Sequence, residues 1–261
     1  MNLEEIVTGA LPIIKETGRF IQKEAASFDL TEVILKGKND LVSYVDKEAE
    51  KMIVVGLKIL LPDAGFITEE GTVSQEQKEF TWIIDPLDGT TNFIHGLPIY
   101  SISVGLMKQG EMVGGIVYEL NKDEIFYAWK GGGAFMNHRP IRVSPVKDIA
   151  ESLLATGFPY YNFDKLPNYL AILNELMINS HGLRRLGSAA VDLAYVACGR
   201  CEGFFEYNLN SWDIAAGILL VKEAGGVVTD FSGNDNALFG RELVASGHIQ
   251  IELLNIIAKH W

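Results

Sequence analysis

Isoleucines recur at the spacing of one helix face in the first part of the chain. They are Ile6, Ile13, Ile14 and Ile21. This spacing predicts a long amphipathic helix over 3–28, with a kink at Pro12 because proline lacks the backbone N–H that a helix needs. A second helix is expected over 46–61, and the sequence GFITEE that follows it predicts a short strand that carries Glu69 and Glu70 at its exit.

Strand-like apolar runs then replace the helical spacing. The expected strands cover 80–84, 100–107, 112–119 and 124–129. Turn residues at Gln109-Gly110 and Asn121-Lys122 separate the last three, which predicts antiparallel hairpins. The glycine run in KGGGAFMNHRPI also reads as a hairpin, because the helix that should follow a phosphate-binding glycine loop is missing from the pattern.

Helical and strand-like patterns alternate in the second half of the chain. Helices are expected over 164–177, 188–197, 212–223 and 249–259, and strands over 203–207, 227–230 and 243–245. The change of pattern predicts two lobes, 1–143 and 144–261, that share an interface and form one compact catalytic unit. Helices packed on largely antiparallel sheets predict an α+β layered fold.

Composition and charge narrow the function classes. With 261 residues, 48% of them hydrophobic, the chain can bury a substantial core. No stretch is apolar for long enough to span a membrane, and the N-terminal segment lacks the basic start of a secretory signal, so a cytoplasmic protein is expected. The net charge of -12 argues against broad binding to nucleic acid or anionic membranes, because such binding needs clustered Lys and Arg.

Cys198 and Cys201 form a C-x-x-C motif. This spacing occurs in redox pairs and in halves of zinc sites. However, no second Cys or His pair stands at ligand spacing, and the surrounding sequence VACGRCEGFF reads as a helix end that enters a strand. Ordinary structural cysteines are the preferred interpretation.

The sequence FTWIIDPLDGTTNF places two carboxylates and a run of small polar residues after a buried strand. Pro86 removes a donor that the sheet ladder would need, so Asp85 and Asp88 are expected on a turn. Gly89 lets a ligand approach the backbone, and Thr90 suits a helix start whose free N–H groups attract phosphate. The carboxylates would repel phosphate unless divalent cations lie between them, and Mg²⁺ takes oxygen ligands of this kind. The motif therefore predicts metal-assisted phosphoryl transfer or hydrolysis.

Two further carboxylates, Glu69 and Asp213, stand at predicted strand or helix termini. Alone, each reads as a solvated loop residue or as a favourable charge at a helix N-terminus. Together with Asp85 and Asp88 they form the set of oxygen ligands that two cations about 3.5–4 Å apart require.

Four blocks of the sequence resemble, in order, the inositol monophosphatase family of magnesium-dependent, lithium-sensitive sugar and inositol phosphatases. They are DLVSYVDKEAE at 40–50, FITEEG at 66–71, WIIDPLDGTTNF at 82–93 and SWDIAAGILLVKEAGG at 211–226. The resemblance spans nearly the whole chain. It implies the family's layered αβαβα sandwich and a homodimer.

The resemblance also implies two or three Mg²⁺ ions in each active site. The implied ligands are Glu69, Asp85 and the Leu87 carbonyl for a first ion, and Asp85, Asp88 and Asp213 for a second. Asp85 would bridge the two ions. The first ion, held by Glu69, would lower the pKa of the attacking water, and Thr90, paired with Asp46, would accept its proton.

Phosphate and substrate contacts follow from the same resemblance. The Gly89 and Thr90 amides would hold the phosphate for in-line attack. The implied substrate contacts are Asp88, Gly187, Ser188, Ala189, Glu206 and Asp213. Asn210 stands where the mammalian inositol enzymes often carry His, which leaves the ring preference open. Lys36 and Lys38 read either as a phosphate-side cation pair or as a solvated loop.

The predicted activity is hydrolysis of myo-inositol monophosphate, or of a similar polyol phosphate, to the alcohol and phosphate. Alternative substrates are 3′-phosphoadenosine 5′-phosphate, fructose 1,6-bisphosphate and histidinol phosphate. Thr91-Asn92 after Gly89-Thr90 favours the inositol branch, because the nucleotide branch typically carries Lys-Glu there. A non-catalytic metal-binding or interaction module is the alternative from a different class, although every implied ligand carboxylate and Thr90 are present.

Overall fold

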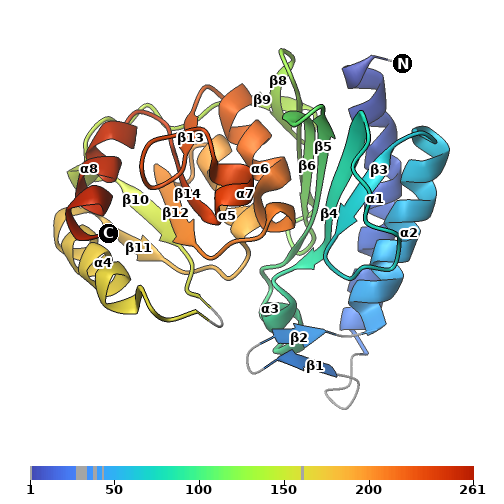
Figure 1. The fold of residues 1–261 in the computed structure, drawn as a ribbon, viewed down its shortest axis with the longest axis horizontal. Coiled ribbons are helices and arrows are strands. Elements are labelled where there is room, and N and C mark those ends of the chain that lie inside the picture. Colours follow the sequence, from blue (N-terminus) through green and yellow to red (C-terminus); the bar gives the residue numbers. More distant parts are fainter. Residues whose placement is uncertain (1, 28–33, 38–39, 43, 160–161) are drawn as a thin grey trace.

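The computed structural model describes residues 2–27, 34–37, 40–42, 44–159 and 162–261, with the backbone alone for 34–37 and 40–42. Helices and sheets alternate in layers across the molecule (Figure 1). The order from one side to the other is helix, sheet, helix, sheet, helix. The α+β layered sandwich that the sequence predicted is therefore confirmed.

The helices follow the predicted pattern closely, with shifts of a few residues at their ends. They are α1 (Leu3–Ala25), α2 (Tyr44–Leu60), α3 (Thr90–Ile94), α4 (Leu166–Asn179), α5 (Ala189–Ala197), α6 (Ser211–Glu223), α7 (Ala237–Gly240) and α8 (Gln250–His260). A capping box starts α1, because Asn2 accepts from the Glu5 N–H at 2.8 Å and Glu5 accepts from the Asn2 N–H at 2.9 Å. Pro12 lies inside α1. The short α7 was not predicted.

A seven-stranded sheet forms from the first half of the chain. Its strands are β3 (Gly65–Thr68), β4 (Phe80–Asp88), β5 (Ser101–Lys108), β6 (Glu111–Glu119), β7 (Glu124–Trp129), β8 (Gly133–Met136) and β9 (Arg139–Ile141), paired in that order. All neighbours are antiparallel except β3 and β4. Gln109 and Gly110 take φ values of 49° and 89° between β5 and β6. Positive φ at both residues gives the tight hairpin turn that the sequence predicted.

A five-stranded sheet forms from the second half. Its strands are β10 (Leu153–Thr156), β11 (Gly182–Arg184), β12 (Gly203–Tyr207), β13 (Val227–Thr229) and β14 (Glu242–Ser246), in the order β11-β10-β12-β14-β13. β10 pairs in parallel with β11 and β12, whereas the other pairs are antiparallel. The sequence predicted neither β10 nor β11. It also missed a small hairpin of β1 (Ile34–Gly37) and β2 (Asp40–Val42).

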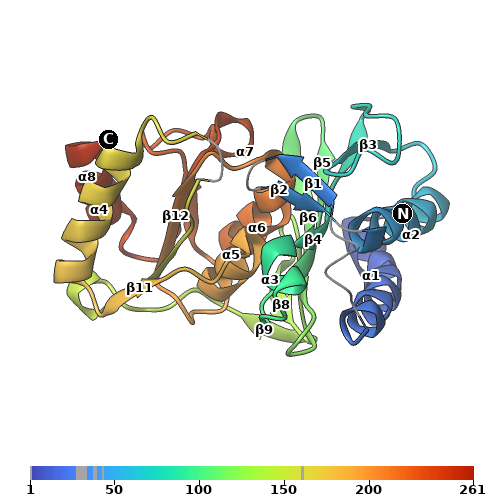
Figure 2. The same cartoon turned by 90° about the horizontal axis from the view of Figure 1, so that it is seen from below.

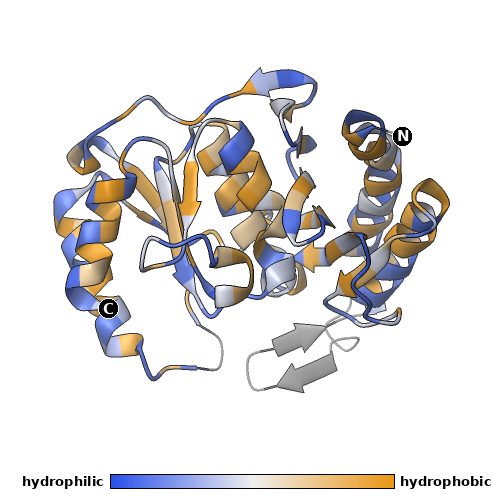
Figure 3. Cartoon of the chain, turned by 45° about the horizontal axis from the view of Figure 1, so that its top comes forward, coloured by the Kyte–Doolittle hydropathy of each residue, from blue (hydrophilic) through white to orange (hydrophobic). Residues whose placement is uncertain are grey.

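Three apolar cores hold the layers together. α1 and α2 cover one face of the seven-stranded sheet, α5 and α6 lie between the sheets, and α4 and α8 cover the far face of the five-stranded sheet (Figures 1 and 2). Every residue of α5 is buried, and its ribbon is mostly apolar in Figure 3. Such a helix belongs in the centre of a protein.

The two sheets lie on either side of residue 143, with β9 ending at Ile141 and β10 starting at Leu153. The division into two lobes at that residue stays a prediction, because α5 and α6 pack against both sheets. Among the described residues, no helix is both long enough and apolar enough to cross a membrane.

The end of β4 differs from the prediction. The sequence placed Asp85 and Asp88 on a turn, but β4 continues to Asp88, and its register against β5 shifts between these two residues. Pro86 lies in the shifted stretch, where the ladder needs no N–H from it. Gly89 follows with φ of 95° and leads directly into α3.

Candidate metal and phosphate site

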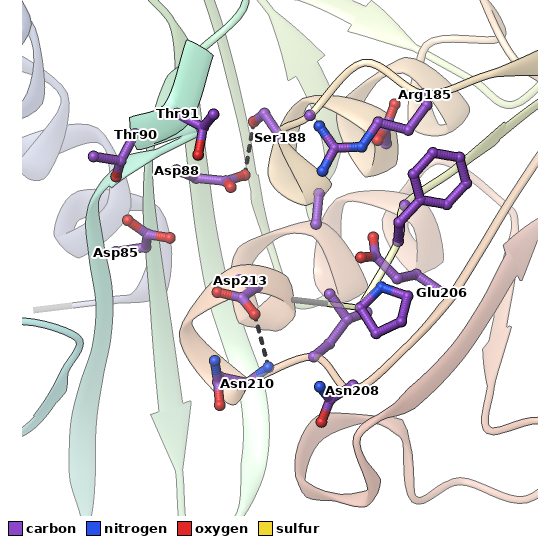
Figure 4. A pocket seen from close by; sticks show the side chains of 18 of the residues that line it. Asp85, Asp88, Thr90, Thr91, Arg185, Ser188, Glu206, Asn208, Asn210 and Asp213 are labelled. Atoms are coloured by element: carbon purple, nitrogen blue, oxygen red, sulfur yellow. Dashed lines mark hydrogen bonds between the residues drawn. The ribbon is translucent and has the colours of Figure 1, made fainter. Parts of the chain in front are cut away.

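A pocket at the ends of β4 and β12 and the beginnings of α5 and α6 collects side chains from both halves of the chain (Figure 4). The predicted site residues that line it are Glu69, Asp85, Leu87, Asp88, Gly89, Thr90, Gly187, Ser188, Ala189, Glu206 and Asp213. Asp46 is the predicted residue outside this lining, and its Oδ1 accepts a hydrogen bond from the Thr90 hydroxyl. The structure brings the predicted residues together, and their roles stay predictions.

Asp85 is the most deeply buried of the β4 carboxylates, with 2% of its surface exposed. Its Oδ1 accepts a hydrogen bond from the Leu87 N–H at 2.9 Å. Burial, and then the charges of Glu69, Asp88 and Asp213, raise the pKa of Asp85 well above its usual range. A carboxylate in this position is costly to ionise unless positive charge is supplied.

Asp88 connects β4 to the start of α5. Its Oδ2 accepts hydrogen bonds from the Ser188 hydroxyl and from the Ala190 N–H, each at 2.7 Å. The helix N-terminus therefore supplies donors to an acidic side chain, as helix N-termini do. Although Asp88 is partly exposed to the pocket, burial raises its pKa to about 6 against the opposing effect of these hydrogen bonds.

Asp213 belongs to the first turn of α6. Its Oδ2 accepts from the Asn210 N–H at 2.7 Å, which completes a capping box with Asn210. Burial and then the charge of Asp88 raise the pKa of Asp213 to about 7. The carboxylate thus combines an ordinary capping role with a position in the pocket.

Thr90 begins α3 beside these carboxylates. Its Oγ1 lies 3.0 Å from Asp46 Oδ1 and 3.0 Å from the Leu87 carbonyl oxygen, so its single proton can go to either acceptor. Asp46 is 1% exposed. It lies inside the first turn of α2, which begins at Tyr44 rather than at Asp46 as predicted.

Glu50 is a buried acidic residue whose role the sequence did not reveal. Its side chain accepts hydrogen bonds from residues 68, 70 and 72, on both sides of Glu69. Glu50 therefore holds the loop that carries Glu69. The available signal was its spacing of four residues from Asp46, which puts both acids on one face of α2.

Glu206 lies on β12, on the side of the pocket away from Thr90 (Figure 4). Burial and then the charge of Asp213 raise the pKa of Glu206 well above its usual range, while Arg185 opposes this. The Glu206 carboxyl packs so closely on Gly157 that a Cβ there would lie 2.0 Å from it. Arg185 also lies over the Phe158 ring, 5.7 Å from its centroid.

Comparison with known proteins shows to which family the chain belongs. Residues 2–260 match the model of the inositol monophosphatase family. The chain belongs to this family. An inositol-1-monophosphatase of Mesorhizobium japonicum is 42% identical over 246 residues, which cover 94% of this chain and 92% of the relative. A relative named Nus factor SuhB, from Escherichia coli, is 41% identical over 90% of this chain and 89% of its own length.

A solved structure agrees with this membership. The crystal structure of the extragenic suppressor protein SuhB from Bartonella henselae superimposes with a TM-score of 0.90 at 40% identity. The match covers 96% of this chain and 97% of that chain.

The donor set of this inositol monophosphatase family member fits a hard metal ion. Its atoms are carboxylate and carbonyl oxygens, the ligands that such ions prefer, and the Glu69 carboxyl lies within hydrogen-bond reach of Asp85. In the part of the chain that the structure describes, no three His, Cys, Asp or Glu side chains already form a compact metal cluster.

Two lysines and two cysteines that the sequence singled out can also be compared with the structure. Lys38 lies outside the described residues, and at Lys36 the structure describes only the backbone. Cys198 and Cys201 are free thiols between the end of α5 and the start of β12, where the helix-to-strand interpretation placed them. Burial raises the pKa of the Cys201 thiol to about 12, so it is not a reactive thiolate.

Proposed function

We propose that this chain is a Mg²⁺-dependent phosphomonoesterase that hydrolyses myo-inositol monophosphate or a similar polyol phosphate. The observation that carries the proposal is the convergence of Asp85, Asp88 and Asp213 from distant elements beside the Thr90–Asp46 pair. Membership of the inositol monophosphatase family supports it, as does the relative named inositol-1-monophosphatase.

The proposed metal ligands are Glu69, Asp85, the Leu87 carbonyl, Asp88 and Asp213, for two or three Mg²⁺ ions. When bound, these ions supply positive charge to the phosphate oxygens and lower the pKa of a ligated water. Thr90 can pass its hydroxyl proton to Asp46, 3.0 Å away, and so become able to accept a proton from the attacking water. The Gly89 and Thr90 N–H groups would orient the phosphate for in-line displacement.

The leaving alcohol would lie toward Glu206 and the start of α5. Gly187, Ser188 and Ala189 line that side of the pocket. Gly187 takes φ of 93°, so its backbone bends sharply into the helix start. In the reaction the P–O bond to the alcohol breaks as the bond to water oxygen forms, which releases the alcohol and inorganic phosphate.

Phosphate release from a panel of substrates tests this function. We expect Mg²⁺-dependent hydrolysis of inositol 1-phosphate in preference to fructose 1,6-bisphosphate, 3′-phosphoadenosine 5′-phosphate and histidinol phosphate, and we expect lithium to inhibit it. Asp88→Asn and Asp213→Asn should abolish turnover, whereas Asp235→Asn, which removes an exposed carboxylate, should not. Normal turnover in either pocket variant would contradict the ligand assignment.

We also propose a second function, as a Nus factor. The support is the printed name of several relatives of about 41% identity, Nus factor SuhB. The net charge of -12 favours contact with protein rather than with nucleic acid in that role. The test is whether this chain, and separately its Asp213→Asn variant, replaces SuhB in an Escherichia coli strain that lacks it. Failure of both forms to replace SuhB would contradict this proposal and leave the phosphatase proposal intact.

A homodimer is proposed from the family resemblance, and a cytoplasmic location is proposed separately, with family membership as its support. Light scattering of the purified protein should give about twice the mass of one chain, 28.8 kDa. A mass of one chain at working concentration would contradict the dimer.

A further inference from the structure

Two polar side-chain atoms in the pocket are buried without a hydrogen bond. Oδ1 of Asp192 and Nδ2 of Asn208 have no hydrogen-bond partner among the residues that the structure describes. Both residues line the pocket on the side of Glu206. Buried polar groups in proteins are nearly always paired, so two such atoms in one pocket, one an acceptor and one a donor, indicate a missing polar ligand.

Asp192 is fixed by the helix that carries it. It is 1% exposed and follows Ser188, the N-cap of α5, by four residues. Residues four apart lie on the same helix face, and helical side chains lean toward the N-terminus, so Asp192 reaches toward the same pocket as Ser188. The charges of Glu206 and Asp88 act on Asp192, and Arg185 partly offsets them.

Asn208 is held with its amide in a defined orientation. Its Oδ1 accepts from Arg241 Nη2 at 2.6 Å, and its backbone oxygen accepts from the same guanidinium nitrogen at 3.0 Å. This contact fixes which amide atom is nitrogen, because only oxygen can accept from Arg241. Nδ2 is therefore a donor without a partner, on the loop between Glu206 and Asp213 (Figure 4).

We propose that Asp192 and Asn208 bind ring hydroxyls of the leaving polyol and so determine substrate specificity beside Glu206. The proposal rests on the phosphatase function. A hydroxyl both donates and accepts, so it can pair with Asp192 in either protonation state and accept from Asn208 Nδ2. Phe158 and Leu209 line the same pocket and offer apolar surface to the C–H faces of a ring.

Paired substrates with and without hydroxyls test the proposal. Inositol 1-phosphate carries ring hydroxyls, and phenyl phosphate carries none. Asp192→Leu removes the polar group but keeps the branch at Cγ and the number of side-chain heavy atoms, and Asn208→Asp removes the donor but keeps the oxygen that Arg241 contacts. For inositol 1-phosphate we expect each variant to raise KM about tenfold, the effect of one hydrogen bond to a charged or strongly polar partner. The kcat, and both constants for phenyl phosphate, should stay unchanged.

Stability and binding measurements separate this role from a structural one. Asp192→Leu removes an unpaired buried group, so its melting temperature should not fall. Calorimetric binding of myo-inositol in the presence of phosphate should weaken in both variants. Asp192→Asn keeps one acceptor oxygen and should show a smaller rise in KM, and it carries the test if the leucine variant does not fold. Asp235→Asn controls for the loss of one negative charge.

The outcomes distinguish the subsite from the function on which it rests. Equal losses on inositol 1-phosphate and phenyl phosphate, or an unchanged KM for inositol 1-phosphate in folded variants, would overturn the hydroxyl subsite alone. A wild-type protein that hydrolyses neither substrate with Mg²⁺ would overturn the proposed phosphatase function, and the subsite with it.

Discussion

Glu50→Gln should weaken both the stability and the metal response of this protein, although Glu50 is not one of the predicted metal ligands. Glu50 is fully buried on α2. Its Oε1 accepts from the Thr68 hydroxyl at 2.9 Å and from the N–H and hydroxyl of Thr72 at 2.7 Å each. Its Oε2 accepts from the Glu70 N–H at 2.7 Å. Glu69 lies between these anchored residues.

The hydrogen-bond geometry sets the size of the effect. A glutamine has one acceptor oxygen and one NH₂ group, whereas both oxygens of Glu50 face a backbone N–H. The amide oxygen should keep the three bonds near Thr68 and Thr72, which leaves the Glu70 N–H facing a donor. An unpaired buried N–H costs about 1–3 kcal/mol. For a chain of this size each kcal/mol lowers the melting temperature by about 2–4 °C.

Thermal unfolding and magnesium titration of activity together test this reasoning. Because the unpaired N–H adjoins Glu69, we expect the Mg²⁺ concentration for half-maximal activity to rise about tenfold or more, as when partners of metal ligands are lost. Glu48→Gln is the matched control, since Glu48 is exposed on the same helix and forms an exposed ion pair with Lys51. Equal melting temperatures for Glu50→Gln and the wild type would refute the account.

Three further predictions concern the pocket. Thr90→Val should lower kcat by roughly 10²–10⁴-fold and Thr90→Ser should restore most of it, because we propose that the hydroxyl passes its proton to Asp46. Steady-state kinetics test this, and a valine variant that kept its kcat would contradict the proposed proton transfer. Gly157→Ala should raise KM for inositol 1-phosphate about tenfold, because the new Cβ displaces the Glu206 carboxyl. The raised pKa values of Asp88, about 6, and Asp213, about 7, mean that the folded state holds these protons more tightly than the unfolded chain. Their contribution to the stability of the metal-free protein is therefore complete below about pH 4 and lost as the pH rises through about 7. Melting temperatures of the metal-free protein that rise steadily over this pH range would contradict this. Added Mg²⁺ should raise the melting temperature more at about pH 8 than at about pH 5.

The seven-stranded sheet was predictable because each strand carries its own signal. Long apolar runs in β5, β6 and β7 are separated by turn residues such as Gln109-Gly110, so local sequence defines both strands and pairing. β10 and β11 lacked such a signal. Each has three or four residues, and their strand conformation depends on parallel pairing with distant segments. Tertiary contacts, which no local pattern encodes, determine such strands.

The residues of the candidate site also differ in how far the sequence reveals them. Asp85 and Asp88 were found from their motif, and Asp46 only from the family resemblance, because the residue is far from Thr90 in sequence. Asp192 and Asn208 were missed. In sequence Asp192 is a polar residue inside a helix and Asn208 a loop residue. Only the fold shows that, within the described parts of the chain, one is an unpaired acceptor and the other an unpaired donor in the same pocket.

The charges of the pocket connect the two halves of the chain. Asp85 and Asp88 come from the seven-stranded sheet, while Asp213 and Glu206 come from the other half. Across the pocket, the charge of Asp88 raises the pKa of Asp213 and of Glu206, and the charge of Asp213 raises the pKa of Asp85. Hydrogen bonds at the helix starts offset only part of this repulsion. Bringing these acids together therefore costs folding free energy in the absence of cations, and a cation bound between them would return part of that cost. On this reasoning the acids that would make the pocket catalytic would also make the folding stability of the chain depend on the ions that we propose they bind.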